Sequence, residues 1–245
     1  MKTLPDISYG PLPTQLIDLY LPEGDEFDLY IHFHGGGLES GSRRVFDPFP
    51  RFLTHRGVAL ASVEYRMFPD AAYPDFLEDA ALAVAYIKNT VKGIRRLFVG
   101  GASAGGYISM MLCFDKRWLS AVGVSPTDIA GFFHDAGQPT KHFNLLKYSG
   151  LDSRRVIVDD TAPLYHIGAE AYPPMRFTVS DKDLPGRLEQ TRLVIATLRH
   201  FGISEDKISL DIRGGHHCHY CEAMLDGQSL YGQMIMDFID WIKRQ

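Results

Sequence analysis

One serine in this chain stands in a pattern that is typical of nucleophilic catalysis. Ser103 is the centre of the segment G-A-S-A-G at residues 101–105. The largely apolar run at residues 96–100 predicts a buried strand before it, and the small and apolar residues 106–114 predict a helix after it. In such a turn the glycines let neighbouring backbone pass closely, and the serine hydroxyl points out of the sheet beside the next backbone N–H. Acyl transfer by Ser103 is therefore our leading hypothesis.

A glycine-rich segment upstream could stabilise the oxyanion that acyl transfer creates. His34-Gly35-Gly36-Gly37 directly follows residues 29–33, which predict a strand. Glycines adopt backbone conformations that other residues resist, and two convergent N–H groups stabilise an oxyanion. A glycine-rich turn without a ligand is the alternative, and the G-x-S-x-G segment downstream makes it the weaker one.

A serine nucleophile also needs a histidine to take its proton and a carboxylate to orient that histidine. The carboxylate should follow a late strand, and both Asp181 and Asp183 follow the strand predicted at residues 175–179. The histidine should follow the last strand, predicted at residues 207–212. The only histidine cluster there has the sequence G-G-H-H-C-H-Y-C at residues 214–221. It offers three candidates, which are His216, His217 and His219.

Three motifs resemble the hormone-sensitive-lipase-like esterases, a family with the α/β-hydrolase fold. They are the H-G-G-G segment, the stretch Y-R-M-F-P-D-A-A-Y-P-D-F-L-E-D-A at residues 65–80, and G-A-S-A-G-G at residues 101–106. Their order and spacing match the family from about residue 28 to residue 125. The resemblance implies an α/β fold with a mostly parallel central sheet flanked by helices, and the short N-terminal part leaves room for only a small cap or none.

The resemblance also implies roles for individual residues. It favours Asp183 over Asp181 as the acid and His217 over His216 as the base, with His219 disfavoured by its spacing. It gives Tyr65, Arg66 and Asp79 supporting roles, in which Asp79 either pairs with Arg66 or is solvated on a helix face. The implied oxyanion donors are the backbone N–H groups of Gly36, Gly37 and Ala104.

These residues together predict a serine carboxylesterase that works through an acyl-enzyme. Its expected substrates are small acyl or aryl esters, and acetylated sugars are among the candidates. Two alternatives stay open. An amidase, peptidase or aryl formamidase would use the same triad on another bond, and a hydrolase-fold binding module would have lost catalysis.

A second motif, Cys218-x-x-Cys221, lies in the histidine cluster and could bind zinc or act as a redox pair. No second C-x-x-C motif or spaced histidine pair completes a four-ligand set. We therefore expect no metal and no organic cofactor.

The composition is that of an ordinary globular protein. The chain has 245 residues, 45% of them hydrophobic, and a net charge of −5, which argues against non-specific binding of nucleic acid. Three cysteines are too few for a disulfide framework, and no segment predicts a signal peptide or a membrane span. We expect a cytoplasmic protein that binds a small ester and neither nucleic acid nor membrane; a homodimer is left open.

Strand and helix patterns alternate along the chain, which favours one α/β domain over residues 1–245. Residues 119–124 predict a further buried strand. The pattern weakens over residues 127–160, which we interpret either as a small lid inserted over the sheet edge or as an irregular connection.

Overall fold

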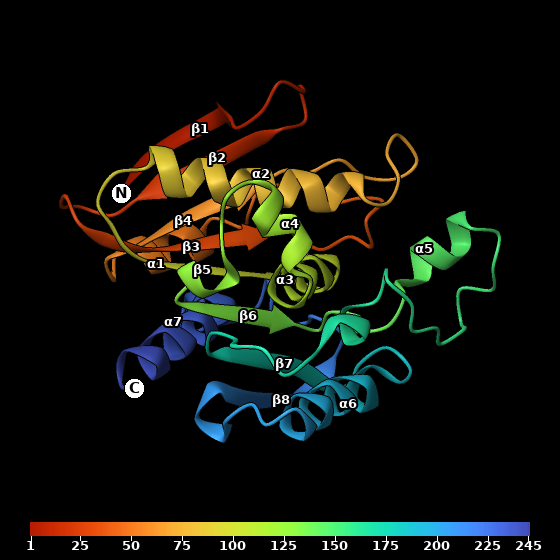
Figure 1. The fold of residues 1–245 in the computed structure, drawn as a ribbon. Coiled ribbons are helices and arrows are strands. Elements are labelled where there is room, and N and C mark those ends of the chain that lie inside the picture. The colour runs from red at the N-terminus through yellow and green to blue at the C-terminus, as the bar shows by residue number, and fades with distance from the viewer.

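An eight-stranded sheet runs through the structure, with helices on both faces (Figure 1). The structure is a computed structural model that describes residues 1–245. The strands are β1 (Lys2–Ser8), β2 (Leu16–Leu21), β3 (Phe27–Phe33), β4 (Val58–Val63), β5 (Ile94–Ala102), β6 (Gly131–Asp135), β7 (Met175–Lys182) and β8 (Ile208–His216). Their order is β1-β2-β4-β3-β5-β6-β7-β8, and only β2 runs antiparallel to its neighbours. The expected mostly parallel sheet is confirmed.

Helices cover the two faces of this sheet unequally. One face carries α2 (Asp75–Thr90), α3 (Ala104–Phe114), α4 (Lys116–Ala121) and α6 (Arg187–His200), and the other carries α1 (Pro48–Thr54) and α7 (Leu230–Lys243). The short helix α5 (Phe143–Tyr148) projects beyond the carboxyl ends of the strands, at the right of Figure 1. Short 3-10 turns (Pro126–Asp128, Pro163–His166, Glu205–Lys207) and a small hairpin of β9 (Met224–Leu225) and β10 (Gln228–Ser229) complete the elements.

The central strands are buried on both faces because successive side chains point to opposite sides of a sheet. All seven residues of β3 are buried. In β3, Ile31 joins the larger core under α2, α3 and α6, whereas its neighbour Tyr30 joins the smaller core under α1 and α7. Phe132 and Phe133 of β6 divide between the two cores in the same way. The rigid centre of the sheet thus holds the ends of β3, β5 and β6 side by side.

The prediction of a strand at residues 119–124 was wrong. These residues form the end of α4 and the turn after it, and the strand of this region is β6. The Asp115 side chain accepts a hydrogen bond from the Arg117 N–H and caps α4, in which Leu119 is the one buried residue. A short apolar run does not distinguish a helix from a strand by its periodicity, and β6 offers only Phe132 and Phe133 as apolar residues.

The segment at residues 127–160 also begins differently from our expectation. The chain still contributes β6 to the middle of the sheet within this segment, and it leaves the sheet only after Asp135. The part outside the sheet, up to β7, contains α5. A lid role for this part stays a prediction. None of the helices combines the length and the apolar character that crossing a membrane requires.

Candidate active site

Ser103 occupies a strained turn between β5 and α3. Its backbone has φ 55° and ψ −110°, a conformation that non-glycine residues rarely adopt. A Cβ atom at Gly101 or Gly105 would overlap the carbonyl oxygen of Phe33 at the end of β3, so only glycine fits at these two positions. The Ser103 N–H donates a hydrogen bond to the Asp135 carbonyl oxygen at 2.8 Å. These contacts hold the hydroxyl at the carboxyl edge of the sheet.

Three polar side chains from distant segments meet at this edge. His217 Nε2 lies 2.8 Å from Ser103 Oγ, and His217 Nδ1 lies 2.6 Å from Asp183 Oδ1. The Asp183 carboxylate also accepts hydrogen bonds from the N–H groups of Leu184 (2.7 Å) and Ser180 (3.2 Å). An imidazole that donates Nδ1–H to Asp183 presents an unprotonated Nε2 to the serine hydroxyl, which is the arrangement of a proton acceptor.

The rival residues lie outside this constellation. His216 is exposed at the end of β8, and its carbonyl oxygen accepts a hydrogen bond from Ser180 Oγ at 2.9 Å. Asp181 is exposed and accepts the Gly215 N–H at 2.8 Å. His219 Nδ1 lies 2.8 Å from the His216 carbonyl oxygen. None of these three side chains contacts Ser103.

The electrostatics of the site favour an ion pair between acid and base. Burial alone would raise the pKa of Asp183, but the hydrogen bonds from His217 and from the backbone outweigh it and lower that pKa. Burial would likewise lower the pKa of His217, and the hydrogen bonds to Asp183 and Cys218 outweigh it, so that the pKa rises to about 9. The imidazolium that forms when His217 takes a proton is therefore stabilised.

The H-G-G-G loop faces Ser103 with free donors. Gly36 (φ 112°) and Gly37 (φ 68°) adopt left-handed conformations, and neither donates its N–H to another protein atom. Ala104 is the first residue of α3, where a helix leaves its N–H groups without an intrahelical acceptor. Asn144 Nδ2 of α5 donates to the Gly37 carbonyl oxygen at 2.5 Å and to Glu39 Oε2 at 2.9 Å. The segment outside the sheet thus braces the loop.

Residues behind the loop fix it from the other side. Tyr65 Oη donates to the His34 carbonyl oxygen at 2.7 Å, and His34 Nε2 lies 2.9 Å from Glu64 Oε1. Arg66 Nε donates to the fully buried Asp79 at 2.9 Å, so the expected pairing of these two residues is confirmed. The sequence did not point to Glu64 or Asn144, because neither belongs to a recognisable catalytic motif and Asn144 lies 107 residues from the glycine that it braces.

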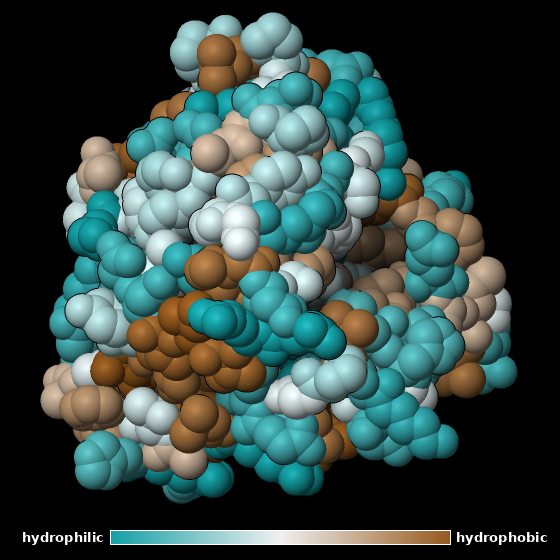
Figure 2. Space-filling view, turned by 90° about the vertical axis from the view of Figure 1, so that its right-hand side faces the viewer, coloured by the Kyte–Doolittle hydropathy of each residue, from teal (hydrophilic) through white to brown (hydrophobic).

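A cavity of about 640 Å³ opens beside Ser103. The view onto the edge where the strands end shows a hollowed face, with apolar surface in the hollow and hydrophilic residues around it (Figure 2). Its apolar lining includes Phe46, Phe49 and Phe143, and its charged lining includes Arg44 and Glu222. Both cysteines of the C-x-x-C motif line it as well.

Comparison with known proteins identifies the fold. A family model described as alpha/beta hydrolase fold matches residues 30–131, which hold the H-G-G-G loop, the Ser103 turn and the first residue of β6. The chain has the α/β-hydrolase fold. The resemblance that the three sequence motifs carried is confirmed.

Solved structures share this hydrolase fold over the whole chain. An esterase B of Lactobacillus rhamnosus superposes with a TM-score of 0.80 at 17% identity and covers 100% of this chain and 87% of its own. A truncated carbohydrate esterase from gut microbiota also gives a TM-score of 0.80, at 14% identity, and covers 100% of this chain and 97% of its own. At such low identity these likenesses show the fold alone.

Relatives found by sequence are esterases. A probable isoprenylcysteine alpha-carbonyl methylesterase of Arabidopsis thaliana is 27% identical over 125 residues, or 49% of this chain. The carboxylesterase NlhH of Mycobacterium tuberculosis is 27% identical over 149 residues, or 58% of this chain. The matched parts span 30% and 41% of these two relatives.

Proposed function

We propose that this hydrolase is a serine carboxylesterase with Ser103 as nucleophile, His217 as general base and Asp183 as the acid that orients His217. The observation that carries the proposal is the continuous chain of contacts from Asp183 through His217 to Ser103 Oγ, at 2.6 and 2.8 Å. A nucleophile in hydrogen-bond contact with a base that a third group orients is the signature of covalent acyl transfer.

The reaction follows from these positions. Ser103 Oγ attacks the ester carbonyl while His217 Nε2 takes its proton, and the N–H groups of Gly36, Gly37 and Ala104 bind the oxyanion. His217 then gives the proton to the departing alcohol, which leaves an acyl group on Ser103. Water attacks this acyl-enzyme with His217 again as base, and the acid is released. A missing oxyanion donor typically costs about 3 to 4 kcal/mol of barrier, so the bracing of the glycine loop matters to the rate.

The cavity supports a small ester as substrate. A volume of about 640 Å³ lies in the range of small-molecule sites, and the aromatic residues Phe46, Phe49 and Phe143 on its walls suit a short acyl or aryl chain. Acetylated sugars fit the same chemistry, and one of the structural neighbours is a carbohydrate esterase.

Substrate comparison tests the choice of bond. We expect kcat/KM for p-nitrophenyl acetate to exceed that for p-nitroacetanilide by at least about a hundredfold, or about 2.7 kcal/mol of barrier. An amide is intrinsically harder to cleave than an activated ester, because p-nitroaniline is a much poorer leaving group than p-nitrophenolate. Equal turnover of the two would favour the amidase, and turnover of neither would favour the binding module.

The raised pKa of His217 predicts an unusual pH profile. Protonated His217 cannot accept the Ser103 proton, so activity is lost as pH falls through its pKa and gained as pH rises. Because that pKa is raised from 6.5 to about 9, the acid limb of kcat/KM for p-nitrophenyl acetate should lie well above 6.5. Cys218→Ser should move the limb to lower pH, since Cys218 is one of the groups that raise the pKa. A wild-type limb at or below pH 6.5 would contradict this prediction.

A further inference from the structure

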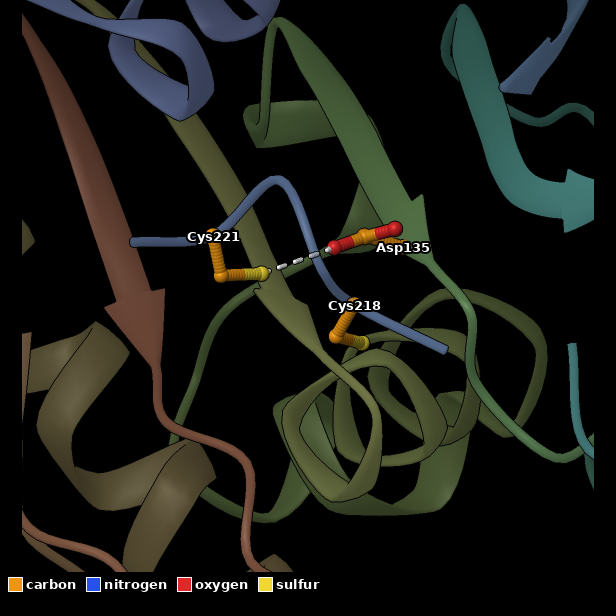
Figure 3. A group of neighbouring side chains, drawn as sticks. All are labelled: Asp135, Cys218 and Cys221. Atoms are coloured by element: carbon orange, nitrogen blue, oxygen red, sulfur yellow. Dashed lines mark hydrogen bonds between the residues drawn. The ribbon is translucent and has the colours of Figure 1, made fainter. Parts of the chain in front are cut away.

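Three ligand-type side chains lie together beside the proposed triad. Asp135 stands at the carboxyl end of β6, and Cys218 and Cys221 stand on the loop after β8 (Figure 3). One carboxylate oxygen and the two sulfurs all lie within 4.8 Å of one another. Figure 3 shows the Cys221 thiol directed at the Asp135 carboxylate, and the Sγ–Oδ2 distance is 3.7 Å. The triad does not require this cluster.

The buried carboxyl group of Asp135 lacks a cation. Asp135 is fully buried, and no lysine, arginine or histidine forms an ion pair with it. Its Oδ1 atom accepts a hydrogen bond from Tyr220 Oη, which leaves Oδ2 facing the thiol. Burial raises the pKa of this carboxyl well above its usual range. A bound cation would favour the carboxylate over the neutral acid, and the Tyr220 hydrogen bond would orient the ligand as outer-shell groups do in metal sites.

The ligand set selects the kind of cation. Two thiolates and a carboxylate are ligands of Zn²⁺, with bonds of about 2.3 Å to sulfur and about 2.0–2.2 Å to oxygen. Tetrahedral coordination at these lengths separates the ligand atoms by about 3.5–3.8 Å, so small side-chain rotations suffice from the present spacing. The two cysteines line the cavity, which gives the ion a route of entry.

The fourth ligand position leads to the proposed base. Cys218 Sγ lies 3.6 Å from His217 Nε2, the same nitrogen that contacts Ser103 Oγ at 2.8 Å. A nitrogen that coordinates a metal cannot also accept the serine proton. His217 Nε2 lies outside the set of three mutually close ligand atoms, so the imidazole would have to turn from Ser103 toward the ion to fill the fourth position.

We propose that Asp135, Cys218 and Cys221 form a site for Zn²⁺ or a similar thiophilic divalent cation, and that His217 Nε2 completes it in competition with Ser103. The protons carried by the two thiols, the carboxyl group and His217 Nε2 pass to solvent on binding. Occupancy would switch off the proposed esterase. The inhibition rests on the proposed function, whereas the binding does not.

Binding is measured on the whole chain, with the thiols kept reduced by a phosphine. Isothermal titration with ZnCl₂ should give one ion per chain, and Cd²⁺ should give the ultraviolet absorption band of metal–thiolate bonds. Cys221→Ser and Asp135→Asn should each weaken binding by at least about a hundredfold. Cys113→Ala is the matched control, because Cys113 is buried in the α3 core and should leave binding unchanged. Failure of the wild type to bind, or wild-type affinity in Cys221→Ser, would overturn the site.

Activity is measured separately with p-nitrophenyl acetate. Saturating Zn²⁺ should lower turnover at least about tenfold, a chelator should restore it, and Cys113→Ala should respond in the same way. Asp135→Asn removes a ligand but keeps an oxygen that accepts the Tyr220 hydrogen bond. Loss of the Zn²⁺ inhibition in both Asp135→Asn and Cys221→Ser would show that the loss does not come from misfolding of one variant. Full turnover with the ion bound would overturn the coordination by His217. Absence of turnover in metal-free protein would overturn the proposed function and leave the binding result standing.

Discussion

Replacing Ser103 by alanine should lower kcat for p-nitrophenyl acetate by roughly 10⁴- to 10⁶-fold, which is the size of the effect when a triad nucleophile is lost. Without the Oγ atom no acyl-enzyme can form, and His217 has no hydroxyl to activate. The remaining rate would come from binding and oxyanion stabilisation alone. A fluorophosphonate probe, which reacts with activated serines, should label the wild type and leave Ser103→Ala unlabelled.

Ser153→Ala provides the matched control for this experiment. Ser153 is exposed and its side chain makes no hydrogen bond in the structure, so its removal should change neither turnover nor labelling. Circular dichroism and thermal unfolding should show both variants folded. Turnover by Ser103→Ala within about tenfold of wild type would refute the nucleophile. A folded wild type that the probe does not label would support the binding-module alternative.

Local geometry explains why the Ser103 turn could be predicted from sequence. Glycine is needed at positions 101 and 105 because both lie close to the Phe33 carbonyl oxygen. This requirement is visible in the sequence as one contiguous five-residue motif. Helix α7 was predictable for a similar reason. Its apolar residues recur at helical spacing, and Ser229 caps its first turn by accepting the Gly232 N–H.

Contacts between distant segments explain what the sequence left open. Nothing near Asn144 indicates that its amide would reach Gly37, because β6 first carries the chain across the sheet. The choice between His216 and His217 depends on where β8 ends. Successive residues on a strand point to opposite sides, and Gly215 at φ 127° breaks the regular alternation. A one-residue uncertainty at a strand end is therefore enough to exchange an exposed histidine for the one that reaches Ser103.

Asp183→Asn should lower kcat by about 10⁴-fold, and Asp181→Asn should leave it close to wild type. The amide at position 183 can donate to His217 Nδ1 and so favour the tautomer whose Nε2 carries the proton and faces Ser103, which cannot accept another. Asp181 only accepts the Gly215 N–H, and an amide oxygen can do the same. Steady-state turnover of p-nitrophenyl acetate by both variants measures the contrast.

Because the two aspartates are two residues apart and both lie at the end of β7, a general effect on the fold would lower the turnover of both variants. A large loss in Asp181→Asn with a mild one in Asp183→Asn would reverse the assignment of the acid. Loss in Asp183→Asn alone would show that the 2.6 Å contact with His217 controls the rate.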